Sequence, residues 1–590
     1  MKIKKTFIHQ IDLPKLPIPP LQETKSKLLE WLKPLVSHEQ YAETEKVVEH
    51  FFKEGGEAEK LQQKLREWNR HQDGNWLTPL WDDMYLQHRN SLPLTSNFNI
   101  LLNRVQQPQL AAKICFLIRE FYHMIIDETL EPQFFKGKPL DMTPYMKLFR
   151  SVRIPQKNSD RFYVADFEKR ANHVVILYNN HFYRLPVTNE EGIPYSVDAI
   201  SRAIKTKVFR DKSEGVNIGV FTTAERNEAA EIYVKLKQSP ANAENLQMIA
   251  DSLFILSIDQ ESESSEEALR NLMLHPCNKY FDKTIQIVIT KHGDIGLNIE
   301  HSAVDGMTIS TVVSHLNKGL QKEYSETAYL SEPPEVRKLE WRLTQEMEER
   351  LEQLETTYLE KTKDLSLLTT TFADFGKENI KELRLSPDAF FHMALQLAMF
   401  RTYGEFRSVY EPVSVGHFLG GRTECARATS IEKRTLVEAI EKGEESNATL
   451  YRLMQVASDA HSARIRACQK GMGVERHLFG LEQMYHRFGR ELGMHTLPEI
   501  FQDPGYLTLC HDFISTSGTI YQNAKARMFA PVVRVGHGLA YFILDHTISL
   551  NLSSYIENEL KGKQLMKHLI QALQELRLIA ESEVFVEDIS

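Results

Sequence analysis

Cysteine, net positive charge and long apolar runs are all scarce in this chain. Its 590 residues contain five cysteines and no CxxC pair. The sequence therefore indicates neither a disulfide framework nor a thiolate metal site, and it fits a reducing compartment. The formal net charge is -9 and the pI is about 6.2, which argues against nucleic acid as the main partner. No stretch approaches the roughly 18 apolar residues of a membrane span.

The sequence also lacks several common catalytic signatures. It contains no GxSxG elbow, P-loop, HExxH or GxGxxG arrangement, which excludes the usual serine hydrolases, P-loop NTPases, zincins and Rossmann oxidoreductases. The start, "MKIKKTFIHQ", has no apolar core of a targeting signal. We therefore expect a cytoplasmic protein with no membrane span, no metal and no bound cofactor.

The pattern of apolar residues predicts a mixed α/β protein. Strand-like runs occur at 173–187, 253–258, 284–290 and 539–555. After "SEPPEV", apolar residues at steps of three and four predict one long helix, with Pro333 and Pro334 at its start. Its apolar stripe is Val336, Leu339, Leu343, Met347, Leu351, Leu354 and Tyr358. A helix packed on its own domain is favoured over a partner-binding coiled coil. We place a domain boundary here, between 1–340 and 341–590.

One histidine stands where a predicted hairpin ends. In "KTIQIVITKHGDIGLNIEHSAVDG" two apolar runs flank turn material, so His301 follows the second strand. An imidazole there can exchange protons near neutral pH if a carboxylate or carbonyl holds its other nitrogen, and Asp305 is a candidate. The HxxxDG spacing is weakly specific, and a structural histidine is the alternative.

A second group of candidates precedes and begins an apolar helix. Ser386 and Pro387 predict a helix start, and Lys377 and Lys381 come shortly before it. Cations beside helix amides could bind phosphate, whereas solvated lysines before a capped helix are the structural alternative. Polar residues also gather at 410–430, at 473–481 and in a predicted strand at 515–533.

Taken in order, six stretches resemble the choline/carnitine O-acyltransferase family. They are "LPKLPIPPLQET", "NKYFDKTIQIVI", "EHSAVDG", "KELRLSPDAF", "YEP" with "GRTE", and "STS" with "FAPVV". "WDDMYLQHRNS" and "LDMTPYMKLFRSVRIP" look most like the carnitine palmitoyltransferase type. The resemblance implies two chloramphenicol-acetyltransferase-like α/β domains, with the active-site tunnel at their interface. It also implies acyl-CoA and carnitine as small-molecule substrates, and we expect a monomer.

The resemblance also implies roles for individual residues. His301 matches the catalytic histidine, Asp305 the acidic residue after it, and Ser517 the donor to the oxyanion. Lys377 and Lys381 match lysines that meet the CoA 3′-phosphate, and Asp388 matches an acidic residue of the CoA-side helix. The positions that match carnitine contacts are Tyr410, Thr423, Arg476, Ser515 and Phe529. Arg476 favours carnitine, because the carnitine carboxylate needs a cation and choline has no such group.

The chain departs from the family at three places. Pro412 stands where a serine is usual, and the stretch 130–142 lacks the membrane-touching insertion of the mitochondrial palmitoyl enzyme. Arg527 and Met528 stand where similar long-chain enzymes have small glycines, so we expect them to shorten the acyl pocket. We therefore expect reversible transfer of a short- or medium-chain acyl group, including one with a polar end. A palmitoyl donor, choline or another alcohol, and a non-catalytic acyl-CoA-binding protein are the alternatives.

Overall fold

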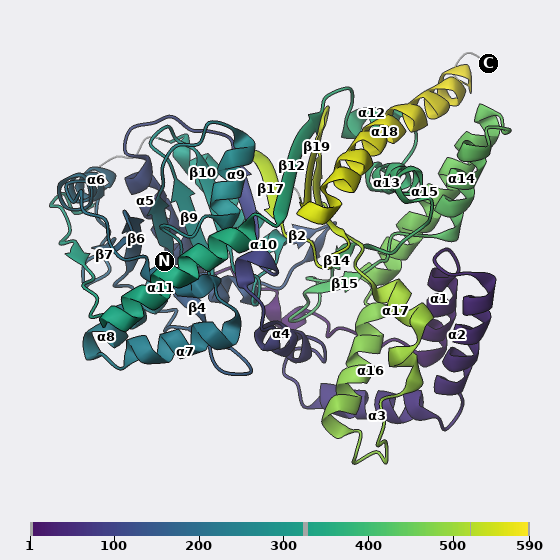
Figure 1. Cartoon of the computed structure of the whole chain (residues 1–590), viewed down its shortest axis with the longest axis horizontal. Coiled ribbons are helices and arrows are strands. Elements are labelled where there is room, and N and C mark those ends of the chain that lie inside the picture. Colours follow the sequence, from purple (N-terminus) through teal and green to yellow (C-terminus); the bar gives the residue numbers. More distant parts are fainter. Residues whose placement is uncertain (1–3, 323–328, 520, 588–590) are drawn as a thin grey trace. The chain divides into compact units, whose positions relative to one another are not determined.

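The chain forms a mixed α/β structure organised around two main sheets (Figure 1). The computed structural model describes residues 4–322, 329–519 and 521–587. Each main sheet belongs to one compact unit, and both units are assembled from separate stretches of the chain. Unit 1 comprises 1–12, 82–367 and 519–530, and unit 2 comprises 13–81, 368–518 and 531–590. The single boundary predicted at 340 therefore does not match this division, because each unit takes in segments from distant parts of the chain.

The sheet of unit 1 has eight strands and contains three of the predicted strand regions. Its order is β11 (Arg337–Lys338), β7 (His181–Pro186), β6 (His173–Tyr178), β8 (Ile255–Ile258), β9 (Ile285–Ile289), β10 (Ile295–Ile299), β1 (Phe98–Leu102) and β17 (Ala524–Phe529). Asn179 and Asn180 join β6 to β7, both with positive φ, as a tight hairpin turn requires. β9 and β10 pair antiparallel, which confirms the predicted hairpin before His301.

Unit 1 also contains most of the helices between residues 110 and 362. They are α5 (Leu110–Ile126), α6 (Val197–Ala203), α7 (Arg226–Lys237), α8 (Pro240–Asp251), α9 (Ser265–Leu274), α10 (Gly306–Leu320) and α11 (Gln345–Thr362). The helix predicted from Pro333 begins only at Gln345, because Thr344 caps it and Arg337–Lys338 instead pair with β7. The rest of the predicted stripe, from Met347 to Tyr358, is buried as expected.

The sheet of unit 2 has five strands. Its order is β12 (Leu365–Phe372), β19 (Ile548–Tyr555), β18 (His537–Ile543), β16 (Ile514–Ser517) and β13 (Val409–Tyr410). β18 and β19 confirm the strands predicted at 539–555. The single strand predicted at 515–533 is wrong, since this stretch forms β16 in unit 2 and β17 in unit 1.

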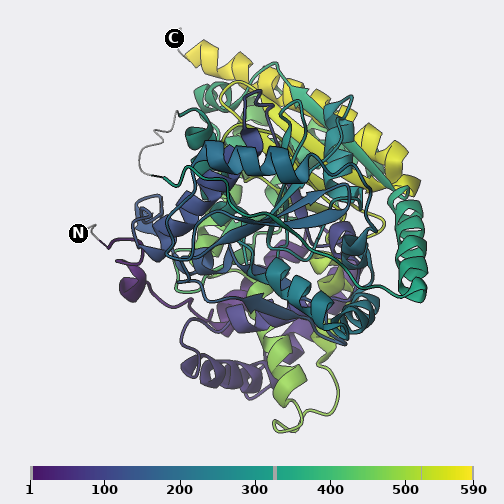
Figure 2. The ribbon, with the colours of Figure 1, turned by 90° about the vertical axis from the view of Figure 1, so that its left-hand side faces the viewer.

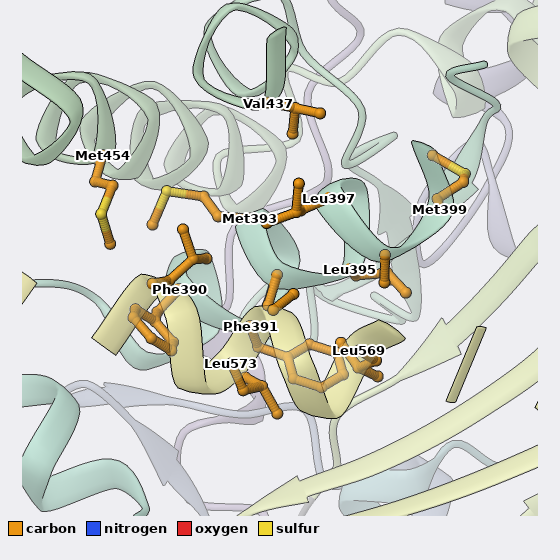
Figure 3. Packing of buried hydrophobic residues seen from close by; sticks show 14 of the residues in the cluster. Phe390, Phe391, Met393, Leu395, Leu397, Met399, Val437, Met454, Leu569 and Leu573 are labelled. Atoms are coloured by element: carbon orange, nitrogen blue, oxygen red, sulfur yellow. The ribbon is translucent and has the colours of Figure 1, made fainter. Parts of the chain in front are cut away.

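The core of unit 2 surrounds helix α13 (Pro387–Tyr403), whose side chains are buried on nearly all sides. Phe390 and Phe391 of α13 pack with Leu569 and Leu573 of α18 (Glu559–Glu587), and Met454 of α15 (Asn447–Gln469) belongs to the same cluster (Figure 3). Figure 2 shows α18, drawn in yellow, leading to the C-terminus. The helices that contribute to unit 2 are α1 (Leu21–Leu32), α2 (His38–Phe51), α3 (Glu57–Arg70), α4 (Thr78–Gln87, which continues into unit 1), α12 (Lys377–Glu382), α13 (Pro387–Tyr403), α14 (Ile431–Lys442), α15 (Asn447–Gln469), α16 (Glu475–Phe488), α17 (Pro504–Cys510) and α18 (Glu559–Glu587). Within the described part of the chain, no helix has the length and apolar character needed to cross a membrane.

Candidate active site

His301 lies just beyond the end of β10 in unit 1, before helix α10 (Figure 1). Its ring packs edge-to-face with that of Phe98 of β1, with ring centroids 4.9 Å apart, and the Tyr85 ring centroid lies 5.6 Å away. About a quarter of the side chain is exposed, at 24%. The imidazole is therefore fixed on one side by aromatic rings and remains accessible on another.

The hydrogen bond of His301 Nδ1 determines which ring nitrogen can act as a base. Nδ1 lies 2.7 Å from the carbonyl oxygen of Val304. Because a carbonyl only accepts, Nδ1 carries the proton, and in the neutral ring Nε2 is the nitrogen that accepts one. Asp305 Oδ1 is 3.8 Å from Nδ1, so the Val304 carbonyl rather than the predicted carboxylate makes the short contact. The nearby carboxylate still favours the imidazolium that forms on proton transfer.

A buried ion network holds the residues on either side of His301. Arg153 Nη1 donates to Ser302 Oγ at 3.1 Å and to Glu300 Oε1 at 3.4 Å, while Nη2 donates to the Tyr85 carbonyl at 2.7 Å. Arg153 Nε donates to Asp160 at 2.7 Å. One guanidinium thus holds the residues directly before and after the histidine, together with the backbone of Tyr85, whose ring lies beside the imidazole.

A second arginine continues this network. Arg226 donates to Asp160 Oδ2 at 2.7 Å and to both oxygens of Asp282, at 2.7 and 3.1 Å. Burial raises the pKa of Asp282 to about 6, although Arg226 opposes the shift. Together with Arg89, which pairs with Asp160 at 3.1 Å, the network balances three guanidinium groups against three carboxylates.

Strand β17 carries three of the predicted substrate contacts on its two faces. Arg527 pairs with Ile100 of β1, and Phe529 pairs with Phe98, so Arg527 and Phe529 share the face of Phe98. Met528 lies between them and therefore points to the opposite face. Of these two residues only Arg527 shares a face with the ring that contacts His301, and the expectation that both shorten the acyl pocket stays a prediction.

In unit 2, Arg476 of α16 is buried among hydroxyl, carboxylate and aromatic groups. Nη2 donates to the Tyr410 hydroxyl at 2.8 Å, and Nη1 donates to Glu475 at 2.5 Å. The guanidinium carbon lies 3.8 Å from the centroid of the Trp81 ring. The arginine is 2% exposed, and these contacts fix its orientation.

Strand β15 (Thr423–Cys425), next to Arg476, supplies a backbone carbonyl oxygen and a buried carboxyl group. Arg476 Nε donates to the carbonyl of Thr423, so in this arrangement Thr423 contacts the arginine through its backbone. The next residue, Glu424, accepts hydrogen bonds from the backbone amides of Cys425 and Arg476. Burial raises the pKa of Glu424 to about 7, against the opposing effect of the Arg476 charge. This carboxyl therefore titrates near neutral pH.

Ser515 and Ser517 lie on β16 in the same unit. Ser515 pairs with Tyr410 in the parallel register of β13 and β16, and Ser517 follows two residues later. The three hydroxyl side chains therefore share one face of the sheet. Both serines are almost fully buried, at 6% and 7% exposure, so hydrogen bonds from their hydroxyls act in a medium of low polarity.

The two predicted CoA lysines lie one helical turn apart on α12, an exposed short helix that precedes α13. Lys377 Nζ pairs with Asp545 at 2.6 Å, and Lys381 Nζ pairs with Glu378 at 3.1 Å. Both side chains are substantially exposed, at 36% and 54%. Residues four apart lie on the same side of a helix, so the two cations can face one anion.

Asp388, in the first turn of α13, belongs to a buried acid–base cluster. It accepts a hydrogen bond from Tyr541 at 2.7 Å and lies 3.1 Å from His461 Nε2. Burial raises the pKa of Glu411 well above its usual range, and the neighbouring Asp388 charge adds to the shift. Lys433 Nζ lies 2.9 Å from His461 Nδ1, and burial lowers the lysine pKa to about 7. The two carboxyl groups can thus share one proton.

The same cluster is where a cation could bind. Asp388, Glu411 and His461 present ligand atoms within 4.8 Å of one another. The ammonium form of Lys433 would donate to His461 Nδ1, which directs the Nε2 proton toward Asp388. The protonated Lys433 therefore already supplies a positive charge beside these carboxylates.

Sequence reasoning missed the residues that hold the predicted ones in place. Val304 acts through its backbone, which no side-chain pattern reveals. Arg153 and Arg226 are each 0% exposed. An arginine next to a strand-like run in the sequence does not indicate whether it is buried. Their partners, Asp160 and Asp282, lie at unrelated places in the chain.

Known proteins resemble this chain along almost its whole length. Residues 16–575 match the family model described as "Choline/Carnitine o-acyltransferase". The chain is 30% identical to the carnitine O-acetyltransferase of Homo sapiens, over 99% of this chain and 96% of the relative. It is 29% identical to the choline O-acetyltransferase of Gallus gallus, over 96% and 92%. It is 27% identical to the mitochondrial carnitine O-palmitoyltransferase 2 of Bos taurus, over 97% and 92%. The chain therefore belongs to the choline/carnitine O-acyltransferase family.

Proposed function

We propose that this protein is a carnitine O-acyltransferase that moves an acyl group reversibly between coenzyme A and the hydroxyl of L-carnitine. The orientation of His301 carries the proposal for transfer: the Val304 carbonyl holds Nδ1–H, so Nε2 is the proton acceptor. An imidazole fixed by a hydrogen bond and by packing against the Phe98 ring is suited to repeated proton exchange.

In the proposed reaction His301 Nε2 takes the proton from the carnitine hydroxyl as its oxygen attacks the thioester carbonyl. A tetrahedral intermediate forms, and a hydrogen bond from the Ser517 hydroxyl stabilises its oxyanion. When the carbon–sulfur bond breaks, the histidine returns the proton to the CoA sulfur. The products are acylcarnitine and CoA, and no acyl-enzyme is required.

Arg476 supports carnitine rather than choline as the acceptor. A buried guanidinium that also holds the Tyr410 hydroxyl offers charge-assisted hydrogen bonds to a carboxylate. Choline has no carboxylate. The similarity to choline O-acetyltransferases keeps choline as the second candidate acceptor.

Arg527 supports a short- or medium-chain acyl group. It lies on the sheet face of Phe98, which contacts His301, and a long apolar chain would have to pack against its charge. We also propose that the enzyme acts as a cytoplasmic monomer.

Release of the free CoA thiol tests these proposals directly. Purified protein is mixed with carnitine or choline and, in turn, with acetyl-, octanoyl- and palmitoyl-CoA. We expect thiol release that depends on carnitine and declines with palmitoyl-CoA. A His301→Ala protein should bind CoA but lose on the order of 10²- to 10⁴-fold in rate. Equal turnover of palmitoyl- and acetyl-CoA would contradict the chain-length proposal.

A further inference from the structure

Arg427 is a second buried arginine close to Arg476, and the two arginines share one carboxylate. Arg427 lies between β15 and α14, and it is 3% exposed. Arg427 Nε donates to Glu475 Oε2 at 2.5 Å, and Arg476 Nη1 donates to Glu475 Oε1 at 2.5 Å. Glu475 therefore bridges two guanidinium groups, with one oxygen on each.

The charges around Glu475 determine how much of the Arg476 charge is left for a ligand. Although burial opposes the shift, the charges of Arg427 and Arg476 lower the pKa of Glu475 below its usual range, so this carboxyl is ionised at neutral pH. Two guanidinium groups around one carboxylate leave a net positive charge. Without Arg427, Glu475 would neutralise Arg476 alone, and an incoming carboxylate would meet a pair with no net charge.

Two further carboxyl groups flank this bridge. Asp512 accepts a hydrogen bond from Arg427 Nη1 at 2.6 Å, and its side chain is 22% exposed, so water screens part of its charge. Glu424 accepts from the backbone amide of Arg476, and its pKa, raised by burial to about 7, leaves it mostly protonated at pH 6. Glu475 is thus the carboxylate that competes most directly with a ligand for the Arg476 guanidinium.

The backbone holds Arg427 firmly at this place. Its φ of 46° lies in the left-handed region, which residues other than glycine adopt rarely and mostly where the surrounding structure imposes it. The Arg427 carbonyl accepts a hydrogen bond from Arg464 at 2.7 Å. The guanidinium carbons of Arg427 and Arg476 lie 5.4 and 5.8 Å from the centroid of one ring, that of Tyr410. Arg427 is therefore fixed beside two groups that contact Arg476, the Glu475 carboxylate and Tyr410.

Building on the proposed transfer to carnitine, we propose that Arg427 is a positioning residue of the carnitine site: by binding Glu475, it leaves the charge of Arg476 available to the carnitine carboxylate. Arg427 does not touch the substrate in this role, and no bond forms or breaks at it. A purely structural role is the competing account. In that case Arg427 only supports the chain between β15 and α14, and its removal would impair every alcohol alike.

Two alcohols that differ in one charge distinguish these roles. L-carnitine methyl ester keeps the hydroxyl and the trimethylammonium group of L-carnitine but has no carboxylate. The value of kcat/KM is measured for both with acetyl-CoA at pH 6, where Glu424 is mostly protonated. We expect the wild-type protein to prefer carnitine by roughly 10- to 100-fold, the usual effect of a hydrogen bond to a charged group. Arg427→Met should lower this ratio about tenfold, through the KM for carnitine rather than through kcat.

Two more variants test the charge argument itself. Arg427→Met/Glu475→Gln removes one charge of each sign, so it should recover most of the wild-type ratio. Arg427→Lys should keep part of the ratio, because one ammonium replaces a planar group that serves Glu475 and Asp512 together. If Arg427→Met does not fold, these two variants carry the comparison.

Arg401→Met is the matched control. Arg401 also lies between two carboxylates of unit 2, with Nε donating to Glu441 at 2.8 Å and Nη1 to Glu575 at 2.6 Å. Its loss should lower stability and leave the ratio of the two alcohols unchanged. Thermal melting of each protein establishes that it is folded before its rates are compared.

The possible results separate this inference from the proposed function. An equal loss on both alcohols in Arg427→Met, an unchanged ratio, or a double variant that does not recover the ratio would overturn the role of Arg427 and leave the transferase proposal standing. A wild-type protein that uses the ester as well as carnitine would overturn the carboxylate contact of Arg476, and this inference with it. The absence of thiol release with either alcohol would overturn the proposed transfer itself.

Discussion

Removing Arg226 should destabilise unit 1 through the carboxylates it leaves behind. The side chain is 0% exposed and bonds to Asp160 and to both oxygens of Asp282. Breaking a buried pair by deleting one partner costs about 3–5 kcal/mol, because the other charge stays buried without compensation. For a folding unit of about 300 residues, this cost lowers the melting temperature by about 5–8 °C.

The reasoning predicts a rescue as well as a loss. An Arg226→Met/Asp282→Leu protein removes one charge of each sign, so it should recover most of the melting temperature that Arg226→Met loses. Arg350→Met is the matched control. Arg350 is partly exposed and pairs with Glu231 at 3.2 Å, and a surface pair contributes about 0–1 kcal/mol.

The pH dependence has a definite sign. The folded-state pKa of Asp282, about 6, lies above that of an unfolded aspartate, and loss of the Arg226 charge raises it further. A raised carboxyl pKa gives stability at low pH that is lost as the pH rises through it. The deficit of Arg226→Met, measured by calorimetry, should therefore shrink between pH 7.5 and pH 5. A double variant less stable than Arg226→Met, or a deficit that grows on acidification, would refute the argument.

Three further predictions concern unit 2. Replacing Lys377 and Lys381 together by alanine should raise KM for acetyl-CoA by roughly tenfold and leave KM for acetyl-dephospho-CoA unchanged, because only the former carries the 3′-phosphate; equal effects on both would contradict a phosphate contact. Since the pKa of Glu424 is raised to about 7 by burial, the stability of the wild-type protein should fall relative to that of Glu424→Gln as the pH rises from 6 to 8, by about 1–1.5 kcal/mol; an unchanged difference between their melting temperatures would show that this carboxyl does not titrate there. Arg476→Gln should raise KM for carnitine by about 10- to 100-fold and change that for choline much less, and an equal loss with both alcohols would argue against a carboxylate contact.

Local patterns predicted the hairpin before His301 well, since alternating isoleucines and a glycine-containing turn specify β9 and β10 without help from the rest of the chain. The start of α11 was predicted too early because the apolar spacing continues through Arg337 and Lys338. These two residues instead form a strand that pairs with the edge of β7.

The faces of β17 show a different limit. Arg527 and Met528 are adjacent in sequence, and only the pairing of β17 with β1 determines which of them shares the face of Phe98. The buried partners of Arg153 likewise come from separate parts of the chain. Register and buried charge pairing are properties of the assembled sheet, so a reading of single segments does not reveal them.

The late position of β17 affects how the protein is made. Phe98 and its partner Phe529 are more than 400 residues apart, and at roughly 5–20 residues per second a ribosome needs tens of seconds to cover that distance. After β10 has been made and until β17 follows, β1 has only one of its two neighbours, and an open strand edge is a template for wrong pairing. The sheet that supports His301 therefore stays incomplete until late in synthesis. Its open edge is where a chaperone would bind, and where a chain whose synthesis is interrupted would aggregate.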